Sequence, residues 1–237
     1  MMSDATPARR VDITAAFRWG LVAFKRKPGI LIGLAAIVFL IYVIQGLGSG
    51  PITDLLERTL ADCGNLASAE CQAAINSSMS AILVTLVMSV VFTALAGIAK
   101  YGVYRATIGM TRGREPLLSD MLPETHFGAF ALFAVIYSIA TIVGLGLCLL
   151  PGIVVILFFQ LTPFYILDRG MPVGEALRAS ARAARSNLVP MLILTVFIVG
   201  TMLIGSILFG VLTLVLLPYS LLVTAHVFRQ LNAEQVA

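Results

Sequence analysis

Residues Phe127–Leu167 read FGAFALFAVIYSIATIVGLGLCLLPGIVVILFFQLTPFYIL. These 41 residues contain no charged side chain, and Pro151-Gly152 is the strongest turn signal among them. A helix needs about 20 apolar residues to cross the ~30 Å hydrocarbon core of a bilayer. The stretch therefore predicts two membrane-spanning helices that are joined at Pro151-Gly152.

The same character extends over the whole chain, which has 59% hydrophobic residues, 12% charged residues and a mean hydropathy of +0.98. A soluble domain has roughly 45–50% apolar and about 25% charged residues, so we expect an all-α bundle in a membrane. A second long stretch, Leu188–Phe228, also needs a turn, at Gly205-Ser206 or at Gly210. The predicted spans are Ile30–Leu47, Met79–Ala99, Phe127–Leu150, Gly152–Leu167, Leu188–Ile204 and Ile207–Phe228.

The positive charges predict how these six spans are oriented, because loops rich in Lys and Arg stay on the cytoplasmic side of a membrane. Fifteen of the sixteen Lys and Arg residues lie before the first span, after the last, or in the loops that follow the second and fourth spans. Only Arg58 lies in the loop 48–78. We therefore expect a multi-pass protein of the bacterial cytoplasmic membrane, with both termini in the cytoplasm and loop 48–78 outside it.

The expected organisation is an N-terminal segment 1–29 with an interfacial helix, a six-span domain 30–231 and a cytoplasmic tail 232–237. The first span could instead be a cleaved signal peptide. Its apolar run is longer than the ~7–15 residues usual for such a peptide, and its loss would upset the charge distribution. A membrane span is therefore the favoured interpretation.

Loop 48–78 contains two of the three cysteines of the chain, Cys63 and Cys71, which are eight residues apart. In an oxidising extracytoplasmic space such a pair can close a small disulfide loop. Two free thiols are the alternative. The third cysteine, Cys148, lies within an apolar span, where cysteine packs as a small hydrophobic residue.

Two segments that precede spans resemble each other at an offset of 160 residues. Ile13–Lys25 and Val173–Arg185 align without a gap, and each places apolar residues on one helix face and basic residues on another, as interfacial helices do. A shorter match links Arg112–Asp120 to Arg169–Glu175. The repeats predict three units, each an interfacial helix followed by a two-span hairpin, with a short, degenerate middle helix over Leu117–Thr125.

The basic residues of the interfacial segments are expected to contact anionic lipid headgroups, since each nearby Lys or Arg contributes about 1 kcal/mol. They lie beside apolar spans without interleaved aromatic residues, so nucleic acid is not an expected partner. A membrane-protein partner or a second copy of the chain is the other expected partner. The headgroup candidates are Arg18, Lys25, Arg26, Lys27, Arg178, Arg182 and Arg185.

Several short motifs resemble a broad bacterial family of multi-span membrane proteins, which includes the membrane domain attached to some glycerophosphoryl diester phosphodiesterases. They are Leu150–Ile153, Pro163, Leu167–Gly170, Ala176–Ser180 and Asn187. The resemblance is strongest over 127–231 and implies the architecture of a six-span bundle. The chain lacks the attached phosphodiesterase domain, and with it the acidic and histidine residues of that chemistry.

No catalytic, cofactor or metal motif occurs in the sequence, and we expect a protein that is not an enzyme. All charged residues lie outside or at the edges of the predicted spans, which argues against a proton-driven transporter. The best buried polar candidates are Gln160 and Thr162 beside Pro163. Proline frees a backbone carbonyl in the preceding helical turn, and the Gln160 side chain could bind that carbonyl or a ligand.

Two hypotheses for the function follow from these features. The first is a non-enzymatic scaffold or accessory subunit whose basic surface and amphipathic helices engage lipid or a protein partner. The alternative is a transporter or permease component for a lipid-like or small apolar substrate, suggested by the internal repeat and the buried polar group. A solid bundle with no polar cavity at mid-membrane would count against the alternative.

Overall fold

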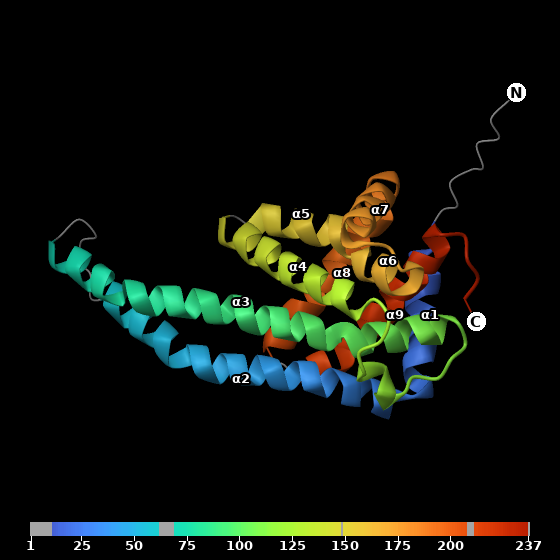
Figure 1. Ribbon diagram of the computed structural model, residues 1–237, viewed down its shortest axis with the longest axis horizontal. Helices are drawn as coiled ribbons and strands as arrows, with labels where there is room; N and C mark the ends of the chain where they lie inside the picture. Colours follow the sequence, from blue (N-terminus) through green and yellow to red (C-terminus); the bar gives the residue numbers. More distant parts are fainter. Residues whose placement is uncertain (1–10, 62–68, 148, 208–210, 237) are drawn as a thin grey trace, which may run out of the picture.

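Helices form almost all of the structure, a computed structural model that describes residues 11–61, 69–147, 149–207 and 211–236. Long helices alternate with short ones, and no strand occurs in the described ranges (Figure 1). In chain order the elements are α1 Ile13–Arg26, α2 Pro28–Ala61, α3 Ala69–Thr111, η1 Leu118–Met121, α4 Phe127–Leu147, α5 Leu149–Phe159, α6 Thr162–Arg169, α7 Val173–Ser186, α8 Leu188–Ile207 and α9 Thr213–Leu231.

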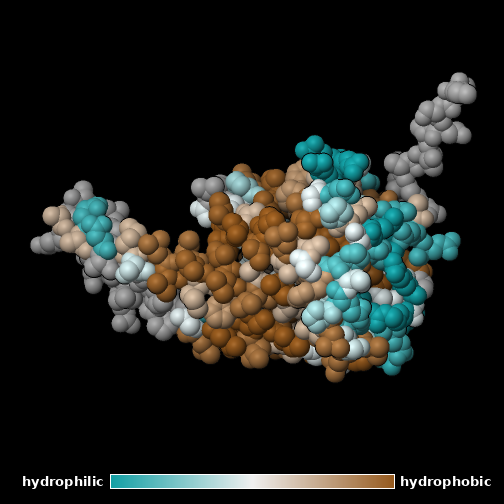
Figure 2. Space-filling model, viewed as in Figure 1, coloured by the Kyte–Doolittle hydropathy of each residue, from teal (hydrophilic) through white to brown (hydrophobic). Residues whose placement is uncertain are grey.

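Six stretches of helix are long and apolar enough to cross a membrane, which confirms the expected fold class. Large apolar side chains cover their outer faces, among them Leu40, Val196 and Leu203, which are 58%, 65% and 61% exposed. A soluble protein would bury such residues, whereas lipid tails solvate them. Figure 2 shows apolar residues over the middle of the face drawn, most of the hydrophilic residues at the right-hand end and a smaller hydrophilic patch at the opposite tip. We call the right-hand end, which carries α1, η1, α7 and the C-terminal segment, the charged end.

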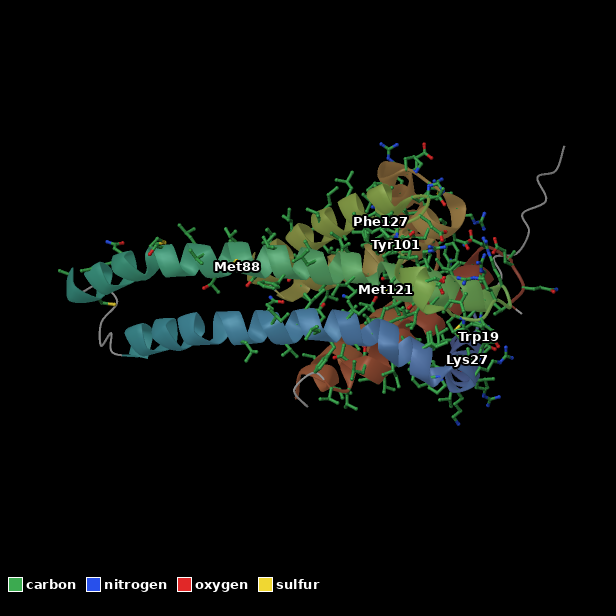
Figure 3. The ribbon with its side chains drawn as sticks, turned by 60° about the horizontal axis from the view of Figure 1, so that its bottom comes forward. Trp19, Lys27, Met88, Tyr101, Met121 and Phe127 are labelled. Carbon is green, nitrogen blue, oxygen red and sulfur yellow. The ribbon has the colours of Figure 1, made fainter. Side chains whose placement is uncertain are left out.

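The first hairpin is much longer than the sequence predicts. At 1.5 Å per residue, the 34 residues of α2 extend about 51 Å, well beyond a ~30 Å hydrocarbon layer. Residues 48–61 and 69–78, expected as a loop, continue α2 and α3 as helix. The hairpin therefore projects past the other helices, away from the charged end (Figures 1 and 3), and Met88 lies on its α3 arm.

The other end of α3 also differs from the prediction. The helix continues twelve residues beyond the expected limit at Ala99 and ends at Thr111. At this end the η1 turn packs on α3 at Gly102, where an added Cβ atom would lie only 2.1 Å from the Met121 sulfur atom. On the α4 side, Tyr101 meets Phe127 edge to face, with ring centroids 5.0 Å apart (Figure 3). The start of α4 is thus packed against the last turns of α3.

The predicted turns lie inside helices. Pro151-Gly152 belongs to the first turn of α5, where the missing N–H of proline is tolerated, and α4 has already ended at Leu147. Gly152 instead lets the two helices approach closely, because a Cβ atom on Gly144 would lie 3.1 Å from its backbone. Gly205-Ser206 likewise lies inside α8. Gly210, the other turn candidate, is outside the described residues.

The internal repeat is visible in the helix boundaries. Helices α1 and α7 have 14 residues each, and their first and last residues differ by the offset of 160 that the sequence predicts. Each is followed by one non-helical residue with nearly the same backbone angles, Lys27 (φ −144°, ψ 61°) and Asn187 (φ −135°, ψ 48°). In the middle unit the short 3-10 helix η1 takes this position. The three-unit organisation is therefore confirmed.

Small residues hold α1 and α7 against the bundle. Ala16, Gly20 and Ala23 are the buried residues of α1, and a Cβ atom on Gly20 would lie 3.0 Å from the Val223 side chain of α9. The buried residues of α7 are likewise Ala176, Ser180 and Ala184. Faces made of such small residues let neighbouring helices approach closely.

Candidate functional site

A cavity of about 260 Å³ lies among the membrane-spanning helices. All six candidate spans contribute to its wall, which is mainly apolar and aromatic. We call it the central cavity. Its lining includes Tyr42 of α2, Lys100 of α3, Tyr137 of α4, Phe159 of α5, Met202 of α8 and Thr224 of α9.

Lys100 alone carries a full charge among the described residues that line the central cavity. Its ammonium nitrogen lies 5.8 Å from the centroid of the Tyr42 ring, a cation–π distance. Among the described residues no carboxylate pairs with it. The expectation that every basic residue lies outside or at the edge of a span is wrong for Lys100, because the candidate span of α3 continues through this residue to Thr111.

The contacts of its neighbours place this charge toward the charged end of the bundle. Tyr42 lies 14 residues after the start of α2, about 21 Å along the helix, and Lys100 lies 11 residues before the end of α3, about 16 Å from it. Tyr101, the next residue after Lys100, packs on Phe127, the first residue of α4, so the charge lies near the level at which that span begins. Lys100 belongs to the second candidate span, and an ionisable residue within a span is a functional-site hypothesis by default.

The fourth span, which lines the same cavity, is a broken helix. Helix α5 ends at Phe159 and α6 begins at Thr162, with Gln160 and Leu161 in a turn between them. Pro163 cannot donate a backbone hydrogen bond, which explains why the helix is interrupted here.

Two side chains bind the carbonyl groups that this break leaves without helical partners. The Ser180 hydroxyl of α7 donates to the Phe158 carbonyl oxygen (2.6 Å), and Gln160 Nε2 lies 3.3 Å from the Leu157 carbonyl oxygen. Gln160 thus lies beside backbone that the break leaves unpaired, and a functional role for this residue stays a prediction. Non-helical backbone at membrane depth is tolerated only where protein or a cavity satisfies it.

Gln160 also joins the broken span to α8. Its Nε2 donates to the Met191 carbonyl oxygen (3.3 Å) and to the Thr195 hydroxyl (3.2 Å). The opposite amide atom, Oε1, is buried and has no hydrogen-bond partner among the described residues. A buried acceptor without a donor costs about 1–3 kcal/mol. A hydrogen-bond donor in the central cavity would recover part of that cost.

Thr162, the second buried polar candidate, is fully buried and does not line the cavity. Its hydroxyl group, like that of the cavity-lining Thr141, has no partner in the described part of the chain. The structure therefore brings Gln160 and Lys100 to one cavity and leaves Thr162 in the packing behind it.

A buried ion-pair network closes the charged end of the bundle. The Asp168 carboxylate is 1% exposed and binds the Arg229 guanidinium through both oxygens, at 2.6 and 3.0 Å. Arg112 adds a contact of 2.8 Å to the same carboxylate, and Arg229 Nε donates to the Thr111 hydroxyl at 3.0 Å. The C-terminal ends of α3, α6 and α9 meet here, and cations are favoured at helix C-termini.

The predicted headgroup residues lie at the charged end. Arg18, Lys25, Arg26, Arg178, Arg182 and Arg185 are exposed on α1 and α7, as lipid contact would require. Lys27 differs, because its ammonium group pairs with Glu115 at 3.1 Å. Figure 3 shows Lys27 with Trp19 at this end of the molecule.

The structure describes only one of the two cysteines for which a disulfide is predicted. Cys71 is buried and disulfide-bonded. Cys63 and Cys148 are outside the described residues, so the pairing of Cys63 with Cys71 stays a prediction.

The residues that sequence reasoning missed are Lys100, Asp168 and Arg229. A usable signal existed for Lys100, because no proline interrupts the chain between Met79 and Thr111, so a continuous helix was readable. No group of three or more His, Cys, Asp and Glu side chains able to hold a metal occurs in the described ranges. Comparison of the chain with protein-family models, with curated protein sequences and with solved structures found no match.

Proposed function

We propose that this protein is a permease component that binds an amphipathic, lipid-like molecule with an anionic group in the central cavity. The observation that carries the proposal is the unpaired ammonium of Lys100 on a mainly apolar cavity lined by all six spans. An acyl chain would contact the aromatic and aliphatic wall. A carboxylate or phosphate would bind the ammonium group, which lacks a carboxylate partner among the described residues.

The broken fourth span supports the same function. Secondary transporters commonly form substrate sites near the bilayer midplane from discontinuous helices between internal repeats. Here the break at Gln160 and Leu161 lies on the central cavity, and the flanking units α1–α3 and α7–α9 repeat one another. A scaffold needs neither a cavity nor an intramembrane charge, so these two features favour the permease over the accessory subunit.

The proposal also covers the orientation of the protein in the membrane and the family to which it belongs. The charged end faces the cytoplasm of a bacterium, since it carries the exposed arginines of α1 and α7, and the long α2–α3 hairpin then projects outside. Membership of the bacterial multi-span family rests on the motifs at Leu150–Ile153 and Leu167–Gly170. It is part of the proposal and concerns the architecture alone. Anionic headgroups would bind the exposed arginines independently of the central cavity.

The test is photo-crosslinking of the purified protein in phosphatidylcholine nanodiscs. The probes are a photoactivatable fatty acid and the corresponding fatty alcohol, which differ only in the anionic group. We expect the fatty acid to label peptides that line the central cavity and Lys100→Gln to lower that labelling roughly tenfold, since a hydrogen bond to a charged group contributes about 1.5–3 kcal/mol. Labelling by the alcohol should change little.

The matched control is Lys25→Gln, which removes an exposed lysine of α1 at the charged end. In this variant, labelling of the peptides that line the central cavity should match that of the unaltered protein. Equal fatty-acid labelling of the Lys100→Gln protein would refute the proposed site. Labelling confined to α1 and α7 would favour the scaffold hypothesis, because those helices carry the exposed headgroup candidates.

A further inference from the structure

The chain after α9 folds back onto the charged end. The Ala233 amide donates to the Gln230 carbonyl oxygen (3.1 Å) and the Glu234 amide to the Arg229 carbonyl oxygen (2.9 Å). This is the hydrogen-bond pattern of a Schellman motif, whose left-handed residue is usually glycine. Here that residue is Ala233, with φ at +57°. This backbone conformation is unfavourable for alanine, and it turns the chain so that Glu234 lies against the bundle.

The Glu234 carboxylate takes a place between two arginines. It forms ion pairs with Arg169 and with Arg229, one oxygen to each. These residues, with Arg112 and Asp168, line an open depression of about 650 Å³ at the charged end. We call these three arginines and the depression they line the arginine cluster.

The two acidic residues of the arginine cluster differ in character. Asp168 is 1% exposed and holds the side chains of Arg112 and Arg229 in place. Glu234 is 33% exposed and lies outside the helices, after the end of α9 at Leu231. Withdrawal of Glu234 would leave three guanidinium groups around one carboxylate, with donors of Arg169 and Arg229 facing the depression. Guanidinium groups arranged in this way match the oxygens of a phosphate, which they bind through paired hydrogen bonds.

We propose that the arginine cluster is a binding site for a phosphate-type oxyanion, and that the Glu234 carboxylate occupies this site until the anion displaces it. The phosphate could belong to a lipid headgroup or be free in solution. The site is separate from the central cavity, because the residues that line the two differ.

The experiment measures tail release in the full-length protein by hydrogen–deuterium exchange of the C-terminal peptide. The amide of Glu234 is protected by its bond to Arg229, so displacement of the carboxylate should speed its exchange. One sample is in phosphatidylcholine nanodiscs, a second has added inorganic phosphate, and a third has phosphatidic acid in the nanodisc. We expect about tenfold faster exchange in the second or third sample.

The three samples separate the sources of the phosphate. Faster exchange with inorganic phosphate alone indicates a soluble ligand, and faster exchange with phosphatidic acid alone indicates a headgroup. Unchanged exchange in both samples would overturn the proposal.

Variants provide a second, independent measurement. Glu234→Gln removes the competing charge, so inorganic phosphate or phosphatidic acid should bind about tenfold more tightly in equilibrium dialysis or native mass spectrometry. Arg169→Gln should weaken binding by a similar factor. The control is Glu175→Gln, at an exposed position of α7. Equal binding by the Glu234→Gln and unaltered proteins would show that Glu234 has only a structural role.

Discussion

Replacement of Asp168 by Asn is the most direct test of the buried network at the charged end. Asparagine keeps the size of the side chain but removes the charge that three guanidinium groups share. Arg229, with 5% of its side chain exposed, would then keep only Glu234 and Thr111 as partners. Removing one member of a buried ion pair costs about 3–5 kcal/mol, and the one carboxylate that Arg229 keeps, Glu234, is partly exposed and offsets this cost only in part.

The assay is the apparent melting temperature of the detergent-solubilised protein, recorded at one scan rate because membrane proteins commonly unfold irreversibly. For 150–250 residues, about 1 kcal/mol corresponds to ~2–4 °C, so Asp168→Asn should lower the melting temperature by roughly 6–20 °C. The control Glu175→Gln, at an exposed position of α7, should have little effect.

The double variant Asp168→Asn with Arg229→Met removes both charges of the pair. It should regain part of the lost stability, since an apolar side chain of similar size needs no partner. If Asp168→Asn melts within ~2 °C of the unaltered protein, the cost assigned to an uncompensated Arg229 is wrong.

Three further variants test other features. Gly144→Ala should destabilise the protein by about 1–3 kcal/mol in the same melting assay, because the new Cβ atom would lie 3.1 Å from the Gly152 backbone. The control Gly146→Ala should not destabilise the protein, because its Cβ atom would have no neighbour within 4 Å. Ala233→Gly relieves the left-handed backbone and should slow hydrogen exchange of the C-terminal peptide; faster exchange would contradict the assigned strain. Pro163→Ala restores a backbone hydrogen-bond donor, so α5 and α6 should join into one helix. Fatty-acid labelling of the central cavity should then fall. Unchanged labelling would show that the break does not shape the cavity.

Local sequence features predicted much of the fold and one residue of the candidate site. The positions of the spans follow from apolar runs of about 20 residues, since lipid imposes that length on any helix that crosses it. The repeat of α1 as α7 was readable at its offset of 160 residues because amphipathic spacing is a local property. Gln160 was identified for the same reason, since its bond to freed backbone depends on Pro163 three positions away.

Helix limits were harder to predict than helix positions. Hydropathy falls at Lys100, which suggested the end of a span at Ala99, yet α3 continues to Thr111. Hydropathy measures preference for lipid, whereas hydrogen bonding and packing against η1 and α4 decide where this helix ends. The turn predicted at Pro151-Gly152 failed for a related reason, because these residues serve close contact between α4 and α5.

The sequence by itself determined a membrane bundle of six apolar helices, its three repeated units and the uneven distribution of positive charge. Only the tertiary structure decided which charges are buried and what they face. Asp168 and Arg229 are 61 residues apart and become partners because α6 and α9 end at the same place. Lys100 faces a cavity because all six spans pack around it. The sequence does not distinguish a charged residue at an exposed helix end from one inside a bundle. Only long-range packing distinguishes these two environments.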